Sequence, residues 1–374
     1  MAGIYLHIPF CKQACHYCNF HFSTSLRQKD AMLAALLKEI SLSQKYLAGE
    51  NIETIYFGGG TPSILEATDI QRIIDEVARF YQIEKNAEIT IEANPDDLTT
   101  AKINAFRQTD INRFSIGIQS FFDADLHYMN RAHDANEALT CVKKTQDAGF
   151  QNLTIDLIYG TPTMSNEQWL ENIEIALSLN VPHLSCYCLT VEPKTALDKL
   201  VKKGKALTVD DEQAIWQFET LIQRMENAGF DHYEISNFGK PNFYARHNSN
   251  YWLGAKYLGL GPSAHSFDGT NRRHNIANNA LYIKSLEENN IPFEEEVLSQ
   301  EQRYNEYVMI SLRTIWGTDI NKIKLFGESY FIYFSNKILE FIKNDYVFQQ
   351  ENIFRLRPKG KLMADFIAME LFFE

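Results

Sequence analysis

The sequence lacks an excess of basic residues, because its 36 Lys and Arg are outnumbered by 48 Asp and Glu, which gives a formal net charge of −12. Nucleic acids and anionic membrane surfaces are bound through clustered Lys and Arg, so we expect neither as a partner. No apolar run approaches the roughly 18 residues that a membrane-spanning helix needs, so we expect no integral membrane segment. The first residues lack the basic stretch of a signal peptide, which favours a cytoplasmic protein.

Cysteine is scarce, with six residues in 374, and the sequence shows no internal repeat, low-complexity tract or Pro-rich linker. So few cysteines in so long a chain exclude the dense disulfide framework of a small secreted domain. Three of them nevertheless fall within eight residues, which in a reducing compartment indicates a metal site. The others, Cys141, Cys186 and Cys188, are expected to be core or barrel-lining thiols.

Apolar strand-like runs alternate with amphipathic helical stretches over the first half of the chain. The predicted strands are residues 4–8, 54–57, 88–92, 113–118, 153–158 and 184–189. The predicted helices between them are residues 26–46, 69–81, 101–108, 135–148 and 166–179. Successive βα units imply a parallel sheet with helices outside, so the predicted fold class is α/β, a partial (β/α)6 barrel that resembles a TIM barrel.

The pattern changes after the barrel. A further helix over residues 211–228 precedes a stretch rich in Gly and aromatic residues, 248–267. From residue 300 the sequence indicates helices rich in Phe and Tyr and a short hairpin that pairs 347–348 with 354–356. This pattern predicts a small α/β module of winged-helix type. We therefore divide the chain into a barrel domain, 1–267, and a small C-terminal domain, 268–374.

Polar and glycine residues follow the predicted strands, at the edge where a barrel of this kind carries its chemistry. A Gly-Gly-Gly-Thr-Pro turn, residues 58–62, follows the second strand, and Glu92 opens a Glu-Ala-Asn-Pro segment after the third. Gln119 ends the fourth strand, Asp156 lies in the fifth, and the cysteine cluster follows the first. We therefore expect these groups to converge on one mouth of the barrel.

The clustered cysteines, Cys11, Cys15 and Cys18, have the spacing Cys-x3-Cys-x2-Cys. Thiolates suit iron–sulfur clusters and zinc, and these short spacings let one loop wrap a compact core. On a cubane cluster, three thiolates leave one iron without a protein ligand, and a small molecule can bind there. The alternative is a structural zinc site with one histidine ligand, although zinc sites usually combine two separated ligand pairs. The candidate histidines are His7, His16 and His21.

Taken in order, the motifs resemble those of the radical S-adenosylmethionine (radical SAM) superfamily. Over essentially the whole chain they are similar to the branch that holds oxygen-independent coproporphyrinogen III dehydrogenase and, closer still, the heme chaperone HemW. The motifs run Tyr-x-His-Ile-Pro-Phe-Cys, Gly-Gly-Gly-Thr-Pro, Glu-x-Asn-Pro, Ser-x-Gly-x-Gln-Ser, Asn-Arg-x-His, Asp-Leu-Ile-Tyr-Gly and Leu-x-Pro-Lys-Gly-Lys-Leu. The resemblance implies a partial barrel of the radical SAM type.

The resemblance also implies a 4Fe-4S cluster on the three clustered cysteines, with S-adenosylmethionine on its fourth iron. The residues that it implies around the cofactor are Tyr5, Tyr17, Gly59, Gly60, Thr61, Glu92, Gln119, Arg131 and Asp156. Their chemistry agrees with that role. Glycines let the backbone approach a ligand closely, and carboxylate and amide oxygens accept hydrogen bonds from an ammonium group or ribose hydroxyls. Arg131 can pair with a carboxylate through two parallel hydrogen bonds.

Two departures separate the chain from the dehydrogenases of this branch. Phe20 stands where they carry a further cysteine, and they have an N-terminal extension, whereas here the first cluster cysteine is already residue 11. A positive match is the His-Asn-x-x-Tyr-Trp segment that begins at His247, which resembles a segment implicated in heme binding in the HemW branch. Imidazole is a natural axial ligand of heme iron, and the Tyr-Trp pair offers a flat apolar surface. His247 can instead be a packing residue, and His265 is a second candidate ligand.

The resemblance therefore favours a heme chaperone that binds heme and delivers it to apo-hemoprotein clients of the respiratory kind. Its implied cofactors are the 4Fe-4S cluster, S-adenosylmethionine and heme. The alternative is an oxygen-independent coproporphyrinogen III dehydrogenase, which removes propionate carboxyl groups by radical oxidative decarboxylation in heme biosynthesis. A zinc-stabilised binding module is a third, minor alternative.

Overall fold

The computed structural model describes residues 2–47 and 49–373, so the outermost residue of each predicted domain, Met1 and Glu374, lies outside the described part. Within it, twelve strands form one sheet in the order β12-β11-β10-β9-β1-β2-β3-β4-β5-β6-β8-β7. The central parallel strands are β1 (Ala2–Ile8), β2 (Ile52–Gly59), β3 (Ile83–Ala93), β4 (Arg113–Gln119), β5 (Leu153–Tyr159) and β6 (His183–Cys188). The strand order has two open ends, so the predicted partial α/β barrel is confirmed.

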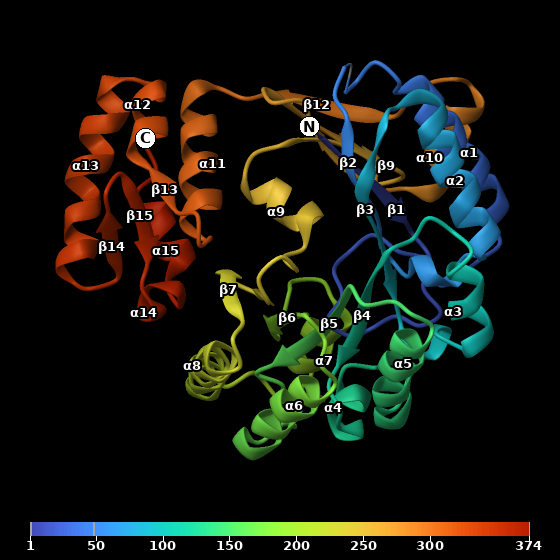
Figure 1. Cartoon of the computed structure of the whole chain (residues 1–374), viewed down its shortest axis with the longest axis horizontal. Coiled ribbons are helices and arrows are strands. Elements are labelled where there is room, and N and C mark those ends of the chain that lie inside the picture. Colours follow the sequence, from blue (N-terminus) through green and yellow to red (C-terminus); the bar gives the residue numbers. More distant parts are fainter. Residues whose placement is uncertain (1, 48, 374) are drawn as a thin grey trace.

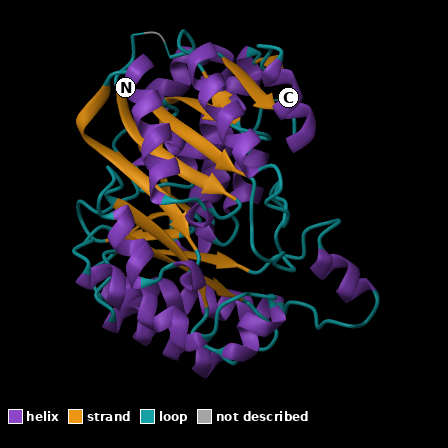
Figure 2. Cartoon of the chain, turned by 90° about the vertical axis from the view of Figure 1, so that its right-hand side faces the viewer, coloured by secondary structure: helices purple, strands orange, loops and turns teal. Residues whose placement is uncertain are grey.

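Helices between the strands pack outside this sheet (Figures 1 and 2). They are α1 (Lys29–Leu42), α2 (Ala67–Phe80), α3 (Thr100–Phe106), α4 (Asp123–Tyr128), α5 (Ala135–Asp147), α6 (Asn166–Ser178), α7 (Ala196–Lys202) and α8 (Asp211–Asn227). In α2 the buried Ile70, Ile73, Ile74 and Val77 follow the three- and four-residue spacing of one helix face. Each predicted strand and helix overlaps an observed one. The sequence pattern does not predict α4, because its six residues are too few to show a helical period.

The sheet extends beyond the barrel at both edges. Next to β6 it continues with two antiparallel strands, β8 (Asn237–Gly239) and β7 (Asp231–Glu234). Next to β1 it continues with the parallel β9 (Lys256–Leu260) and then the antiparallel β10 (His265–Phe267), β11 (Asn271–Asn275) and β12 (Phe293–Val297). The short helix α9 (Arg246–Trp252) contacts β1 and β2, and α10 (Asn279–Glu287) packs on α1. These elements bring the segment that begins at His247 against the barrel.

The C-terminal residues have a hydrophobic core of their own, centred on Tyr304, Val308, Phe334 and Ile367. Five helices surround a three-stranded antiparallel sheet, β13-β15-β14, and Figure 1 shows this module beside the large sheet. The elements are α11 (Gln300–Leu312), β13 (Thr318–Asp319), α12 (Ile320–Phe326), α13 (Glu328–Lys343), β14 (Val347–Gln350), β15 (Ile353–Leu356), α14 (Pro358–Lys361) and α15 (Ala364–Glu370). The predicted small α/β module and its hairpin are confirmed.

The domain boundary at residue 267 stays a prediction, and the strand order favours a later one. β11 and β12 lie in the region that we assign to the small domain, yet they pair with the large sheet. The second core begins only at Tyr304. The sequence signal that led to 267 is the end of the βα alternation. It marks the point where the sheet turns antiparallel rather than the point where the sheet ends.

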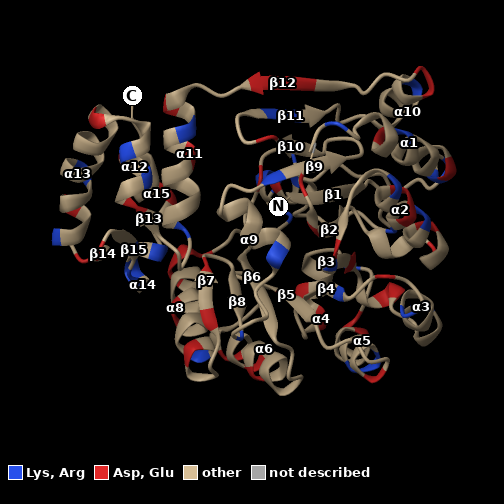
Figure 3. Ribbon diagram, turned by 45° about the horizontal axis from the view of Figure 1, so that its top comes forward, with Lys and Arg blue, Asp and Glu red and all other residues tan. Residues whose placement is uncertain are grey.

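The exposed edge of the large sheet is acidic. β12 carries Glu294, Glu295 and Glu296 in succession, and Figure 3 shows them as a red strand at the end of the sheet. Charge on an edge strand opposes the addition of a further strand from another chain. Among the described residues, no helix combines the length and the apolar character needed to cross a bilayer.

Candidate functional site

The three clustered cysteines lie in the loop that connects β1 with α1. Backbone hydrogen bonds close this loop at its base, since Cys11 N donates to Ser23 O at 3.0 Å and Ser23 N donates to Pro9 O at 2.9 Å. Neighbouring barrel segments donate to two of the sulfurs. Thr61 Oγ1 donates to Cys11 Sγ at 3.5 Å, and Arg131 Nη1 donates to Cys15 Sγ at 3.3 Å. The loop is thus tied to the ends of the strands.

The candidate histidines for a zinc site have other partners. His7 Nε2 lies 2.8 Å from His21 O, His16 Nδ1 lies 2.9 Å from Tyr128 O, and His21 Nε2 lies 2.7 Å from Asn279 Oδ1. In the described part of the chain, no three His, Cys, Asp or Glu side chains are placed to hold a single metal ion. A cluster of several irons needs only one thiolate on each iron, so its sulfurs need not surround a single ion. Each of the three candidate histidines therefore has a hydrogen-bond partner within the fold.

A cavity of about 480 Å³ opens beside the cysteine loop at the carboxyl ends of β2 to β6. It collects eleven of the predicted site residues: Cys11, Cys15, Tyr17, Cys18, Gly59, Gly60, Thr61, Glu92, Gln119, Arg131 and Asp156. They come from the loop, from four strand ends and from the segment after α4, so the fold brings together residues that the sequence spreads from position 11 to position 156. This placement agrees with the expectation that the polar groups at the strand ends converge on one mouth of the barrel.

Two glycines of the predicted site permit a close approach of the backbone. A Cβ on Gly60 would lie 2.6 Å from Phe10 O, so no side chain fits where this turn meets the cysteine loop. Gly59 has φ +105°, and a Cβ there would lie 2.5 Å from the His7 ring. Substitution at either position would strain the turn that forms the cavity wall.

Two carboxyl groups of the cavity, Glu92 and Asp156, have raised pKa values, which favours their neutral forms. Glu92 accepts hydrogen bonds from Tyr56 Oη at 2.8 Å and Gly59 N at 3.2 Å. Its burial, and to a lesser extent the nearby Asp156, raises its pKa to about 7. Burial likewise raises the pKa of Asp156 to about 6. A bound cation and hydroxyl donors would favour the charged forms of both groups.

Arg131 supplies the opposite charge. Its Nη2 donates to Asn94 Oδ1 at 2.6 Å and to Gly117 O at 2.8 Å, and its buried Nε has no hydrogen-bond partner among the described residues. Arg131 lines the cavity, and a guanidinium cation at a cavity wall suits an anionic ligand group. The thiols therefore fit an iron–sulfur cluster. The carboxylate acceptors and the Arg131 guanidinium fit a ligand that carries both an ammonium and a carboxylate.

Several cavity residues are absent from the predicted site. They are Gln13, Asn94, Ser115, Tyr187, Thr190 and Glu192. Asn94 belongs to the Glu-x-Asn-Pro motif, so the sequence held a signal for it. Tyr187 is near the end of β6 and Thr190 follows that strand, so position at a strand end is the only available signal. Of the remaining cysteines, Cys141 and Cys186 are buried in the core, and Cys188 reaches the cavity wall.

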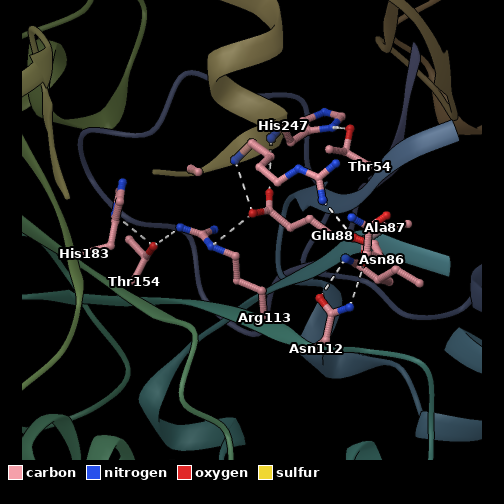
Figure 4. Close-up of polar contacts among 12 residues, drawn as sticks. Thr54, Asn86, Ala87, Glu88, Asn112, Arg113, Thr154, His183 and His247 are labelled. Atoms are coloured by element: carbon pink, nitrogen blue, oxygen red, sulfur yellow. Dashed lines mark hydrogen bonds and ion pairs between the residues drawn. The ribbon is translucent and has the colours of Figure 1, made fainter. Parts of the chain in front are cut away.

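Tyr5 and His247 do not line this cavity. Tyr5 lies in the barrel interior, stacked on Tyr56 and His247. His247 is 2% exposed, its Nδ1 lies 2.8 Å from Thr54 Oγ1, and its Nε2 lies 2.8 Å from Tyr251 Oη. Figure 4 shows His247 above the Glu88 carboxylate, which accepts its backbone N–H at 3.1 Å. Both ring nitrogens of His247 thus have hydroxyl partners in this structure, and its assignment as a heme ligand stays a prediction.

Comparison with known proteins agrees with this site. Residues 5–176 match the radical SAM superfamily model, and these residues include all the cavity residues that the resemblance implies. The heme chaperone HemW of Bacillus subtilis is 31% identical over 370 residues, which cover 98% of this chain and 97% of that protein. The chain belongs to the HemW family of radical SAM proteins. The heme chaperone HemW of Escherichia coli is 36% identical over 267 residues, or 70% of this chain and 69% of that one.

A solved structure supports the fold. The coproporphyrinogen III oxidase HemN of Escherichia coli, described as a radical SAM enzyme, superposes with a TM-score of 0.86 over 99% of this chain and 90% of its own. Sequence identity is only 23%, so this likeness shows a shared architecture and not a shared reaction.

Proposed function

We propose that the protein is a heme chaperone that binds heme and passes it to apo-hemoproteins. The observation that carries this proposal is similarity to relatives named heme chaperone HemW, at 31% identity over 98% of the chain and 36% identity over 70% of it. Phe20 supports it, since the dehydrogenase branch carries a cysteine at this position. Phe20 is 67% exposed and lines the cavity beside the loop, so it is not a core residue kept for packing alone.

Within this proposal, Cys11, Cys15 and Cys18 hold a 4Fe-4S cluster. Its open iron would bind the amino and carboxylate groups of S-adenosylmethionine. The turn at Gly59 and Gly60 then gives the methionine end room against the backbone. The remaining cavity residues would orient the cofactor, because Arg131 offers a cationic side chain to its carboxylate and Glu92 offers an acceptor to its ammonium or ribose.

The same proposal includes expectations for the client protein, the cellular compartment and the role of S-adenosylmethionine. We expect respiratory apo-hemoproteins as clients and a cytoplasmic location, in line with a chain whose described helices do not span a membrane. We expect the cluster and S-adenosylmethionine to serve assembly or regulation.

Radical decarboxylation of coproporphyrinogen III is the second candidate function. One observation favours it, namely a cavity that holds the residues needed to place S-adenosylmethionine beside an open iron. The same cavity is required by any member of the superfamily, so it does not distinguish the two functions. Phe20 does, because it removes the extra thiol of the dehydrogenases.

The test uses anaerobically reconstituted full-length protein. We expect about four irons and four sulfides per chain, a saturable Soret band on titration with hemin, and no vinyl-bearing product from coproporphyrinogen III and S-adenosylmethionine under reducing conditions. Substrate-dependent vinyl formation would establish the second candidate instead. One equivalent of zinc without iron or sulfide would refute both.

A further inference from the structure

A second cavity, of about 610 Å³, also borders the cysteine loop. Its walls come from β1, the loop, α9, the β9–β10 extension and α11 of the C-terminal module. Figure 1 shows α9 between α11 and the strands of the barrel. Its volume lies within the range of about 300–1,000 Å³ that is usual for small-molecule sites. Neither the cluster nor S-adenosylmethionine occupies it in the proposed function.

The lining of this second cavity is largely aromatic. The phenyl, phenol and indole rings come from Tyr5, Phe20, Tyr251, Trp252, Tyr257 and Phe267. Glu306 is the only carboxylate among the described lining residues, and it forms an ion pair with Arg272. Flat aromatic walls without an unpaired acid suit a large planar apolar ligand.

Of the three histidines that line this cavity, His265 has no hydrogen-bond partner on either ring nitrogen among the described residues. It projects from β10, is exposed, and makes no hydrogen bond through its ring nitrogens among the described residues, while its ring stacks on His274 at 5.5 Å. By contrast, His7 has partners on both nitrogens, Tyr5 Oη at 3.2 Å and His21 O at 2.8 Å, and His21 has Asn279 on Nε2. Partial burial, with smaller effects from His274 and Arg272, lowers the pKa of His265, and this direction favours the neutral imidazole that binds metals.

His247 lies beneath this cavity without lining it. Its ring bridges Thr54 of the barrel and Tyr251, and Tyr251 is itself a wall of the cavity. Burial, and secondarily Arg113, lowers the pKa of His247 to about 3, so the ring stays neutral and bonded on both sides. Such a residue fixes the Tyr-Trp wall rather than reaching a ligand in the cavity.

Phe20 and Asn19 line both cavities. A ligand in the second cavity would therefore touch the loop that carries the cluster cysteines. Phe20 is an exposed apolar side chain that borders both cavities.

From these contacts we propose that heme binds in the second cavity with His265 as its axial ligand, while His247 is a positioning residue that holds the Tyr251 wall. This inference rests on the proposed heme-binding function and assigns its site. Porphyrin faces pack against Trp252, Tyr257 and Phe20, and one edge of the ring meets the cysteine loop.

The test compares full-length wild type with His265→Ala, His247→Ala and, as the matched control, His274→Ala. His274 is exposed and stacked on His265 but does not line the cavity. Hemin affinity, the Soret maximum and the ferric EPR spectrum are measured, with iron content as the check on folding. We expect His265→Ala to weaken hemin binding at least tenfold and to change the spin state, and free imidazole to restore the wild-type spectrum. His274→Ala should behave as wild type.

The expected result for His247→Ala is different. The hemin that this variant still binds should show the wild-type Soret maximum and ferric EPR spectrum. Added imidazole should not change either spectrum. The inference is overturned if His265→Ala retains the wild-type spectrum and affinity, or if imidazole rescues His247→Ala or His274→Ala instead. A wild-type protein that binds no hemin refutes the proposed function, and this site assignment with it. Hemin binding with the wrong ligand refutes the assignment alone.

Discussion

Arg131 Nη1 donates to the sulfur of Cys15 at 3.3 Å, which links the segment after α4 to the middle cysteine of the loop. The other end of the guanidinium is fixed by Asn94 and Gly117. The same side chain therefore faces a cluster thiolate and retains an orphaned donor, Nε. A cation in this position would stabilise negative charge both on the Cys15 thiolate and on the carboxylate of a bound ligand.

Replacement of Arg131 by Met should weaken S-adenosylmethionine binding by about 10- to 150-fold, because a charged hydrogen bond contributes about 1.5–3 kcal/mol. Arg131→Lys keeps the charge but loses the planar fork, so we expect an intermediate loss. Equilibrium dialysis of the iron-loaded protein measures both. Equal affinity in Arg131→Met and wild type would contradict the assigned role.

Gly59→Ala should abolish S-adenosylmethionine binding, because the residue has φ +105° and its new Cβ would meet the His7 ring. The matched control is Gly229→Ala, which has φ +76° but no atom within 4 Å of the added Cβ. The control should lose about 1–2 kcal/mol of unfolding free energy and bind normally. Ligand binding by Gly59→Ala at the wild-type level would show that the turn does not shape the site.

Much of this cavity can be predicted from the sequence, because parallel strands end at one edge and their terminal polar residues are easy to recognise. Gln119 and Asp156 are examples, since each needs only its place in a strand to be located. The cavity-lining Tyr187 and Thr190 carry no such chemical signal, and Tyr187 is placed by the pairing of β5 with β6.

The hydrogen-bond partners of the His247 ring could not be predicted from its motif. The motif names the residue type, but its Nδ1 partner is Thr54, 193 positions away, and the contact exists only because α9 packs on β2. Similarly, His265 is free because β10 turns its ring toward a cavity closed by α11. Local sequence determines neither arrangement, since both depend on contacts between distant segments.

Affinity for S-adenosylmethionine should rise with pH between about 5.5 and about 7.5, by up to about tenfold per unit below the carboxylate pKa. The pKa of Glu92 is raised to about 7 and that of Asp156 to about 6, so the acceptors gain charge across this window. In the ligand-free protein, the free energy of unfolding depends on pH in the opposite direction. The folded state holds protons that the unfolded state releases, so unfolding free energy falls as the pH rises from about 5 to 7.

Glu92→Gln is the check on this assignment, because its amide cannot titrate. Isothermal titration at several pH values should give a flatter profile for the variant than for wild type. A wild-type profile that stays flat, or that falls with rising pH, would contradict the role of Glu92 as a charged acceptor.

His247→Ala should lower the unfolding free energy by about 2–4 kcal/mol, because it leaves a cavity and removes the partner of the buried Thr54 hydroxyl. His265→Ala should change it by less than about 0.5 kcal/mol, as is usual for an exposed side chain. Urea denaturation of both variants without heme measures the difference. Equal stability of the two variants would show that His247 does not fix the wall.

The central claim, that the protein is a heme chaperone, is tested most directly by the kinetics of heme transfer. Heme-loaded protein is mixed with increasing amounts of an apo respiratory b-type cytochrome, and the Soret shift is followed, with apomyoglobin as the passive scavenger. We predict that transfer to the cytochrome speeds up with its concentration and exceeds the rate of loss to the scavenger. A rate that is independent of the cytochrome and equal to passive loss would contradict the account.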